Sequence, residues 1–129
     1  MKKYLNSDRE HFIEFLKMPI DTSLQMLNLL KFKDEVEGEG ISGQAQYKKY
    51  MKAAQPFFQK SNAKVLFYGD AQYALIGPKD LEWDKVLIVE YATKDDFVNM
   101  VTHPDYPSTL RTMALEDSRL IFCSSKTNE

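Results

Sequence analysis

Apolar residues along the chain follow two different periods, which separate predicted strands from predicted helices. Residues 23–32 are apolar at both alternating positions, so we expect a strand whose two faces both need cover. From Ser42, which suits an N-cap, apolar residues follow the helical period, although Pro56 should kink or nearly end that helix. Further strands are predicted at 63–69, 84–91 and 118–123, and residues 72–76 continue the second strand or form a separate edge.

Helical patterns also precede the first strand and follow the third. Ser7 opens a capping box for a short N-terminal helix that should end before Pro19. Thr93 caps a helix that stops near Pro104, and a further helical stretch follows at 106–114. Without the first helix, the order strand, helix, strand, strand, helix, strand predicts an α+β, ferredoxin-like split βαβ fold with a four-stranded antiparallel sheet.

In such a fold the two helices cover only one face of the sheet. The strands that start at Ser23 and Asp84 are nevertheless apolar on both faces. A two-fold dimer with its sheets packed face to face would cover the second face, because in an isologous interface the same apolar face of each copy is buried against the other. We therefore expect a homodimer.

The composition narrows the class of protein. The chain has 129 residues, of which 43% are apolar and 28% charged, as in one ordinary globular domain. A formal charge of −2 leaves no basic surplus for a phosphate backbone, which argues against a nucleic-acid partner. The longest strongly hydrophobic run, 86–89, is far too short to span a membrane, and no signal-peptide pattern is present. Cys123 is interpreted as a small core residue, and a lone cysteine fits a cytoplasmic location.

Several short motifs, taken in their order along the chain, resemble those of a known family. They are Met26–Phe32, Tyr47-x-x-Tyr50, Ile76-Gly77-Pro78, Trp83-Asp84, Pro104-x-Tyr106, Arg111 and Ala114–Leu120. Together they resemble the domain of unknown function 1330, a family of the dimeric α/β-barrel superfamily, over residues 24–121. The resemblance implies a fold and a pocket location. It implies no single reaction, because the superfamily includes cofactor-free monooxygenases, muconolactone-isomerase-like enzymes, haem-dependent chlorite dismutases and stress-responsive binding modules.

Two departures from that family concern its pocket. Asn62-Ala63 stands where many relatives carry Gly-Gly, and Leu110 stands where some carry His, so a pocket centred on Arg111 is favoured over one centred on a histidine. The predicted organisation is an N-terminal helical extension, a ferredoxin-like dimeric α/β-barrel domain and a flexible C-terminal tail, at residues 1–21, 22–125 and 126–129 respectively.

Arg111 is the leading candidate for ligand binding. It lies on the apolar last helical stretch, where an unpaired guanidinium is costly to bury, so it needs an anion. Two kinds of partner stay open at this point. One is an internal carboxylate, most simply Glu116, Asp117 or Glu90, and the other is the carboxylate of a ligand.

Five other residues are candidates for lining the same cleft, each with a structural alternative. Asn28 is a mid-strand amide that would contact a ligand or be a satisfied core residue, and Lys31 would reach the cleft or be a surface charge at the strand end. Tyr47 and Tyr50 share one helical face and would offer hydroxyls to a ligand or simply pack in the core. Trp83 would wall the cleft or anchor a turn.

His103 and Asp117 are the leading proton-transfer candidates if the protein is an enzyme. His103 precedes a proline at a helix end, where stabilisation by the helix dipole is the alternative role. His11 has no neighbours at metal-ligand spacing and should face solvent. We therefore expect no metal and no cofactor, and a haem or zinc enzyme is disfavoured.

Two main functional hypotheses follow from the sequence, and haem binding that depends on His103 is a third, less favoured one. In the first, a homodimer binds a small organic anion or aromatic molecule in a cleft between sheet and helices. If this protein is an enzyme, the resemblance implies cofactor-independent monooxygenation or isomerisation, with an enolate stabilised by Arg111. In the second, the protein is a non-catalytic dimeric binding or stress-response module. The expected partners are a second copy and a small molecule, with neither nucleic acid nor membrane.

Overall fold

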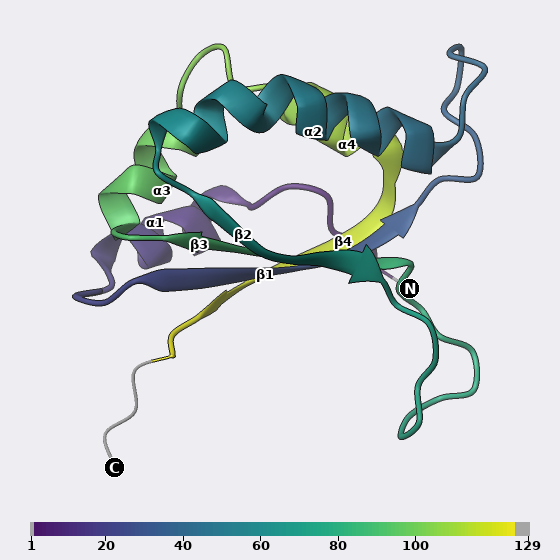
Figure 1. Ribbon diagram of the computed structural model, residues 1–129, viewed down its shortest axis with the longest axis horizontal. Helices are drawn as coiled ribbons and strands as arrows, with labels where there is room; N and C mark the ends of the chain where they lie inside the picture. Colours follow the sequence, from purple (N-terminus) through teal and green to yellow (C-terminus); the bar gives the residue numbers. More distant parts are fainter. Residues whose placement is uncertain (1, 126–129) are drawn as a thin grey trace.

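The computed structural model describes residues 2–125 and confirms the α+β, ferredoxin-like fold (Figure 1). In chain order its elements are α1 (Arg9–Lys17), β1 (Leu24–Phe32), α2 (Gly43–Lys60), β2 (Lys64–Asp70), β3 (Lys85–Tyr91), α3 (Lys94–Val101), α4 (Ser108–Ala114) and β4 (Leu115–Cys123). The sheet has the strand order β2-β3-β1-β4, and every pair of neighbours is antiparallel. The central pair β1 and β3 therefore carries the core.

All the helices lie on one side of this sheet (Figure 1). β1 buries every second residue from Leu24 to Leu30, and β3 does the same from Leu87 to Tyr91, toward the helices. The alternate residues, such as Leu27, are only half-buried, since nothing in residues 2–125 covers the opposite face. Within this chain, therefore, the apolar residues on the helix-facing side of the sheet are buried, and those on the opposite side are not.

The start of α2 is fixed by a tight crossing of three segments. The Gly43 N–H donates to the Lys33 carbonyl over 2.9 Å, and the Lys33 N–H donates to the Ala114 carbonyl over 3.0 Å. A Cβ at position 43 would overlap both carbonyl oxygens, so only glycine fits. This crossing joins the end of β1 to the end of α4 and sets where α2 passes over the sheet.

Two of the predicted helix caps are confirmed and one is shifted. The side chains of Ser42 and Thr93 accept hydrogen bonds from the backbone of the first turns of α2 and α3. At α1 the cap is Asp8 rather than Ser7, because the Asp8 carboxylate accepts the His11 N–H over 2.8 Å. A carboxylate is also favoured over a hydroxyl at the positive end of the helix dipole.

Pro56 does not end α2, which continues to Lys60. The proline removes one backbone hydrogen bond, but the residues beyond it are held by packing. Phe58 is buried in the core, and the Phe57 ring lies 5.6 Å from that of Tyr106, edge to face. Tertiary contacts therefore outweigh the local penalty.

Two predicted strand boundaries were wrong. Residues 72–76 form neither an extension of β2 nor a separate strand, but belong to the loop between β2 and β3. β4 begins three residues earlier than predicted, at Leu115, because it follows α4 directly and pairs with Phe32 across a register shift. The predicted tail, 126–129, lies outside the described residues.

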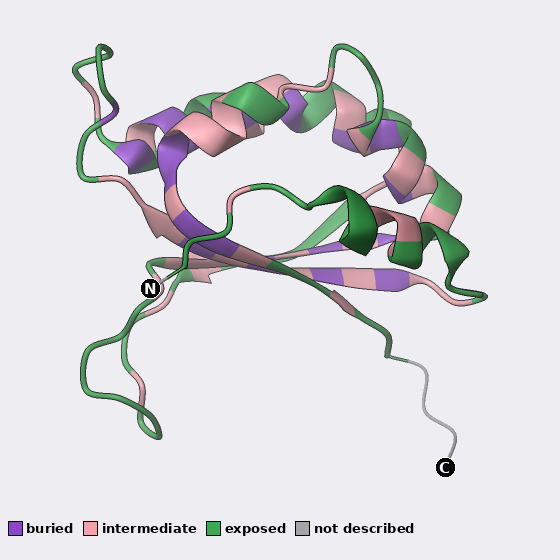
Figure 2. Cartoon of the chain, turned by 180° about the vertical axis from the view of Figure 1, so that it is seen from behind, coloured by how far each residue is buried: buried purple, intermediate pink, exposed green. Residues whose placement is uncertain are grey.

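The N-terminal segment packs against the domain rather than standing apart from it (Figure 2). The Phe15 ring of α1 meets Phe97 and Phe122 edge to face, with centroids 5.8 and 6.0 Å away. Lys94 Nζ caps the end of this segment by donating to the carbonyls of Leu16 and Met18. No helix within residues 2–125 is long and apolar enough to cross a membrane.

Candidate functional site

A cavity of about 920 Å³ lies between the sheet and the helices. Every element except β2 contributes to its wall, and the N-terminal segment before α1 does so as well. The only ionisable side chains other than tyrosines along the described wall are His11, Arg111 and Arg119, and none of the wall residues is an aspartate or glutamate. The cavity is therefore apolar over most of its surface, with a positive charge in its wall.

Arg111 supplies the cation that has no carboxylate beside it. Its guanidinium donates through Nη1 to the Leu5 carbonyl and through Nη2 to Asn28 Oδ1, each over 3.3 Å. Both acceptors are neutral, and both distances exceed those of strong charge-assisted hydrogen bonds. Within residues 2–125, Arg111 forms no ion pair.

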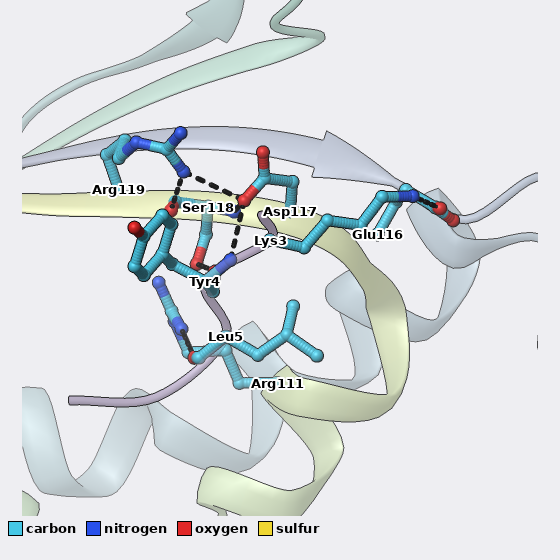
Figure 3. Close-up of polar contacts among 8 residues, drawn as sticks. All are labelled: Lys3, Tyr4, Leu5, Arg111, Glu116, Asp117, Ser118 and Arg119. Carbon is cyan, nitrogen blue, oxygen red and sulfur yellow. Dashed lines mark hydrogen bonds and ion pairs between the residues drawn. The ribbon is translucent and has the colours of Figure 1, made fainter. Parts of the chain in front are cut away.

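The carboxylates predicted as internal partners of Arg111 are engaged elsewhere, and Figure 3 shows this for Glu116 and Asp117. Glu116 pairs with Lys3, Asp117 with Arg119, and Glu90 accepts a hydrogen bond from Gln25. The sequence left two kinds of partner open for Arg111, an internal carboxylate and the carboxylate of a ligand. The described residues do not provide the internal one.

Asn28 lies at the middle of β1 and is buried. Its Nδ2 donates to the carbonyls of Met26 and Leu87 over 3.4 and 3.3 Å, while its Oδ1 accepts from Arg111. The amide is thereby oriented with its oxygen toward the guanidinium. Asn28 is therefore hydrogen-bonded within the protein, as its structural alternative predicts, and it also lines the cavity. Its contact with a ligand stays a prediction.

Tyr47 places a buried hydroxyl in the same wall, beside Arg111 and without an acceptor for its proton. No hydrogen bond of good geometry reaches this hydroxyl within the described structure. Burial raises the pKa of this phenol far above its usual value, although the charge of Arg111 and the contact of its side chain with the hydroxyl oppose the shift. Tyr47 therefore presents a neutral O–H donor close to a cation.

Tyr50 and Tyr106 share a hydrogen bond between their hydroxyls. Burial is the main cause that raises the pKa of both phenols, so both stay protonated at neutral pH. Tyr106 was part of a recognised motif but was not predicted as a site residue. Its role depends on a partner in α2, and only the motif Pro104-x-Tyr106 could have pointed to it.

The N-terminal segment closes one side of the cavity (Figure 3). The Tyr4 N–H donates to Asp117 Oδ1 over 2.8 Å, and Ser118 Oγ donates to the Tyr4 carbonyl over 2.7 Å. The next residue, Leu5, provides the carbonyl that Arg111 contacts. Sequence reasoning did not anticipate this part of the site.

Asp117 holds that segment in place and lies outside the cavity wall. It accepts hydrogen bonds from the Tyr4 N–H, the Ser118 N–H and Arg119 Nη1. Burial alone would raise the pKa of this carboxyl, but the three hydrogen bonds and the charge of Arg119 lower it below 3.8. Asp117 is therefore ionised at neutral pH, and its Oδ1 is held by three donors.

Three other predicted site residues also lie outside the cavity wall. Lys31 is the penultimate residue of β1. Trp83 packs its ring 5.1 Å from the guanidinium of Arg119. His103 accepts a backbone N–H at Nδ1 over 3.0 Å, and its ring lies 5.4 Å from that of Phe57. The structure thus gathers Arg111, Asn28, Tyr47 and Tyr50, but not these three.

Two further predictions concern single residues. Cys123 is exposed, which corrects its interpretation as a core residue: it pairs with Gln25 on the uncovered face of an edge strand. His11 is exposed, as predicted, and forms a 3.1 Å contact with Asp8. Residues 2–125 contain no cluster of three or more His, Cys, Asp or Glu side chains that could hold a metal ion.

No family model matches the chain, and no curated protein matches it significantly. The resemblance to the domain of unknown function 1330 is therefore supported as far as its ferredoxin-like fold and not as that particular family. A dimeric protein of unknown function with a ferredoxin-like fold from Bacteroides fragilis shares 16% identity over 78% of this chain and 94% of its own, with a TM-score of 0.50. At this identity the likeness concerns the fold alone.

A much nearer likeness is to the RPA0582 protein of Rhodopseudomonas palustris, whose function is described as unknown. The crystal structure of its methylated form shares 30% identity with this chain, covers 99% of it and 98% of its own length, and has a TM-score of 0.90. A second crystal structure gives 29% identity, coverage of 98% and 99%, and a TM-score of 0.88. This chain therefore belongs to the same family as the RPA0582 protein.

Proposed function

We propose that this protein binds a small organic anion or an anionic aromatic molecule in the cavity between its sheet and helices. The observation that carries the proposal is the buried, unpartnered hydroxyl of Tyr47 beside Arg111, a cation without a carboxylate. A ligand oxygen at this place would accept from both groups. It would do so without displacing any protein ion pair.

The energetics favour a ligand in this position. A buried hydroxyl without a partner costs about 1 to 3 kcal/mol, and hydrogen bonds to a charged group contribute about 1.5 to 3 kcal/mol. The two contacts that Arg111 makes to neutral acceptors, at 3.3 Å, satisfy its charge weakly. An anion would therefore gain a strong partner in Arg111 and relieve the unsatisfied donor of Tyr47.

A thermal-shift screen tests this function. Carboxylates of short and long chain, phenols and enolisable ketones are compared on the wild type, on Arg111→Gln and on Arg9→Gln, which removes an exposed cation outside the cavity. At about a hundred times the dissociation constant, a ligand should stabilise the wild type and the Arg9 control by about 2.7 kcal/mol. The shift should vanish in Arg111→Gln. An equal shift in Arg111→Gln, or no shift in the wild type, would contradict the proposal.

A second candidate function, a cofactor-independent monooxygenase or isomerase, is favoured by the same group of donors. A cation with neutral hydroxyls around it could stabilise the oxygen of an enolate. The proton-transfer candidates His103 and Asp117 stand outside the cavity wall, so binding without catalysis is the better supported function. Liquid chromatography with mass spectrometry of a ketone incubated with the protein in air would separate the two, since an oxygenated product has a higher mass and an isomerised one has the same mass but a different retention time.

The partner we propose for the uncovered face of the sheet is a second copy of this chain. Leu27 and Ile88 pair across β1 and β3 on that face, and Phe67 and Ile121 extend it into both edge strands. Phe67 and Ile121 are 50% and 43% exposed, which is costly for side chains of this size. The related fold from Bacteroides fragilis is described as dimeric.

The loop between β2 and β3 supports the same assembly. It projects past the uncovered side of the sheet (Figure 1), and its Tyr73, Leu75 and Ile76 are 80%, 86% and 94% exposed. A copy stacked on this face would meet the loop and bury those side chains.

Light scattering at micromolar concentration tests the dimer. Phe67→Asp should dissociate it, whereas Val65→Asp should not, because Val65 is similarly exposed, at 47%, but pairs with Val89 on the helix-facing side. A monomeric wild type would contradict the proposed dimer. Equal dissociation by both variants would contradict the proposed face.

We also propose a link between this family and the domain of unknown function 1330. The residues of the quoted motifs are far apart in sequence, yet Asn28, Tyr47, Tyr50, Tyr106 and Arg111 all line one cavity. Motifs that converge on one cavity are expected of relatives that share a binding site. A crystal structure of a member of that domain with its ligand tests the link, since the ligand should contact the corresponding residues.

A further inference from the structure

The cavity has two chemically different parts. Its polar groups, Arg111, Asn28, Tyr47, Tyr50 and Tyr106, come from the first half of α2, the middle of β1 and the segment around α4. The wall toward α1 and α3 is mainly apolar, with side chains from α1, the end of α2, β1, β3, α3 and β4: Phe12, Phe15, Met26, Phe58, Val89, Phe97, Met100 and Phe122. It also includes the polar residues His11, Tyr91 and Thr102.

The helix α2 sets the direction from one part to the other. Tyr47 lies in its second turn, next to the crossing at Gly43, and Phe58 lies near its far end. Eleven residues separate them, which corresponds to roughly 16 Å along a helix that rises 1.5 Å per residue. Both side chains face the sheet, so the cavity is elongated beneath α2.

Arg111 is the one cation of the wall that has no carboxylate partner within the described residues. Arg119 also reaches the wall, but Asp117 neutralises it over 2.8 Å. The exposed His11 lies 3.1 Å from the Asp8 carboxylate. None of the apolar wall residues carries a charge, and Phe15, Phe97 and Phe122 form a continuous aromatic surface there. A second charge on the ligand would be buried against that surface without a partner, which is strongly unfavourable.

From this arrangement we infer that the ligand is a hydrophobic monoanion, with its charged group at Arg111 and Tyr47 and an elongated apolar body beneath α2, toward Phe58, α1 and α3. This inference rests on the proposed function and narrows it to one class of ligand. It excludes short carboxylates, dicarboxylates and phosphorylated metabolites as good ligands. An apolar body is also what a cavity of about 920 Å³ needs, since a small acid would leave most of its apolar wall without contacts.

Calorimetric titration with straight-chain acids of four, six, eight and ten carbons tests the inference, below the concentrations at which they form micelles. Affinity should rise roughly fourfold with each methylene group, as expected when that group is buried. The alcohol of ten carbons reports the contribution of the charge. The dicarboxylic acid of ten carbons reports the cost of a second charge, and both should bind at least tenfold more weakly than the monoacid.

The variants Arg111→Gln and Arg9→Gln complete the test. In Arg111→Gln the preference for acid over alcohol should disappear, while affinity should still rise with length. The Arg9 control should behave as the wild type. If short and long acids bind equally, or if the dicarboxylic acid binds as tightly as the monoacid, the inference is wrong although the proposed function stands. If no organic anion binds the wild type, both are wrong.

Discussion

Two arginines in the wall of one cavity have opposite surroundings. Arg119 donates to the Asp117 carboxylate and to the Ser118 carbonyl, both over 2.8 Å, and its guanidinium lies 4.8 and 5.1 Å from the rings of Tyr4 and Trp83. Arg111 has two neutral acceptors, each at 3.3 Å. Arg119 therefore belongs to the structure of the β4 edge, whereas Arg111 keeps its charge available to a ligand.

The largest effect on the free energy of unfolding should come from breaking the ion pair of Arg119. Asp117→Asn leaves Arg119 without its carboxylate and weakens the acceptor of the Tyr4 N–H. Removing one member of a largely buried ion pair should lower the free energy of unfolding by about 3 kcal/mol. Urea denaturation measures this loss. Asp105→Asn, at an exposed carboxylate, should stay within about 0.5 kcal/mol of the wild type.

The pH dependence of the destabilisation by Asp117→Asn tests whether the charge of the carboxylate is its cause. The folded-state pKa of Asp117 lies below its usual value of 3.8, so its ionised form stabilises the fold above that pH. Stability from this group should be complete at neutral pH and decline as the pH falls through the folded-state pKa. Wild type and Asp117→Asn should therefore converge in acid. A difference that is constant down to about pH 2 would show that the carboxylate charge is not responsible.

Direct comparison of the two arginines should give the next largest effect. Arg119→Gln should destabilise the protein by about 2 kcal/mol, since it removes a charge-assisted hydrogen bond to Asp117 and another to the Ser118 carbonyl. Arg111→Gln should change stability by less than about 1 kcal/mol, because the loss of two weak hydrogen bonds is offset by removing an unneutralised charge. Thermal unfolding without any ligand measures both. Equal losses would mean that Arg111 is structural too.

The sheet and its helices were predictable because periodic burial determines them. Strand β1 alternates between the core and the uncovered face as its apolar residues do, and Ser42 and Thr93 cap helices where expected. Pro56 and residues 72–76 were misjudged for two different reasons. The helix continues past Pro56 because Phe58 packs in the core, whereas residues 72–76 have no neighbouring strand to pair with and leave their apolar side chains exposed.

The site was predictable only in part. Asn28, Tyr47, Tyr50 and Arg111 were chosen as polar residues in apolar segments, and they do line one cavity. The N-terminal segment was missed because it acts through backbone groups, the Tyr4 N–H and the Leu5 carbonyl, which no side-chain pattern reveals. Asp117 was taken as a proton-transfer candidate because its structural role includes a hydrogen bond from the Tyr4 N–H, 113 residues away in the chain, which adds to the local ones from Ser118 and Arg119.

The smallest effect concerns two tyrosines on one face of α2. Tyr50→Phe removes the partner of the Tyr106 hydroxyl and should destabilise the protein by about 1 kcal/mol. Tyr47→Phe removes a hydroxyl that has no partner, so it should be neutral or slightly stabilising without a ligand. With a saturating monoacid the order should reverse, because only Tyr47 then loses a hydrogen bond to the ligand. If Tyr47→Phe were as destabilising as Tyr50→Phe in the empty protein, its hydroxyl would have a structural role, and the main argument for a ligand at Arg111 would fail.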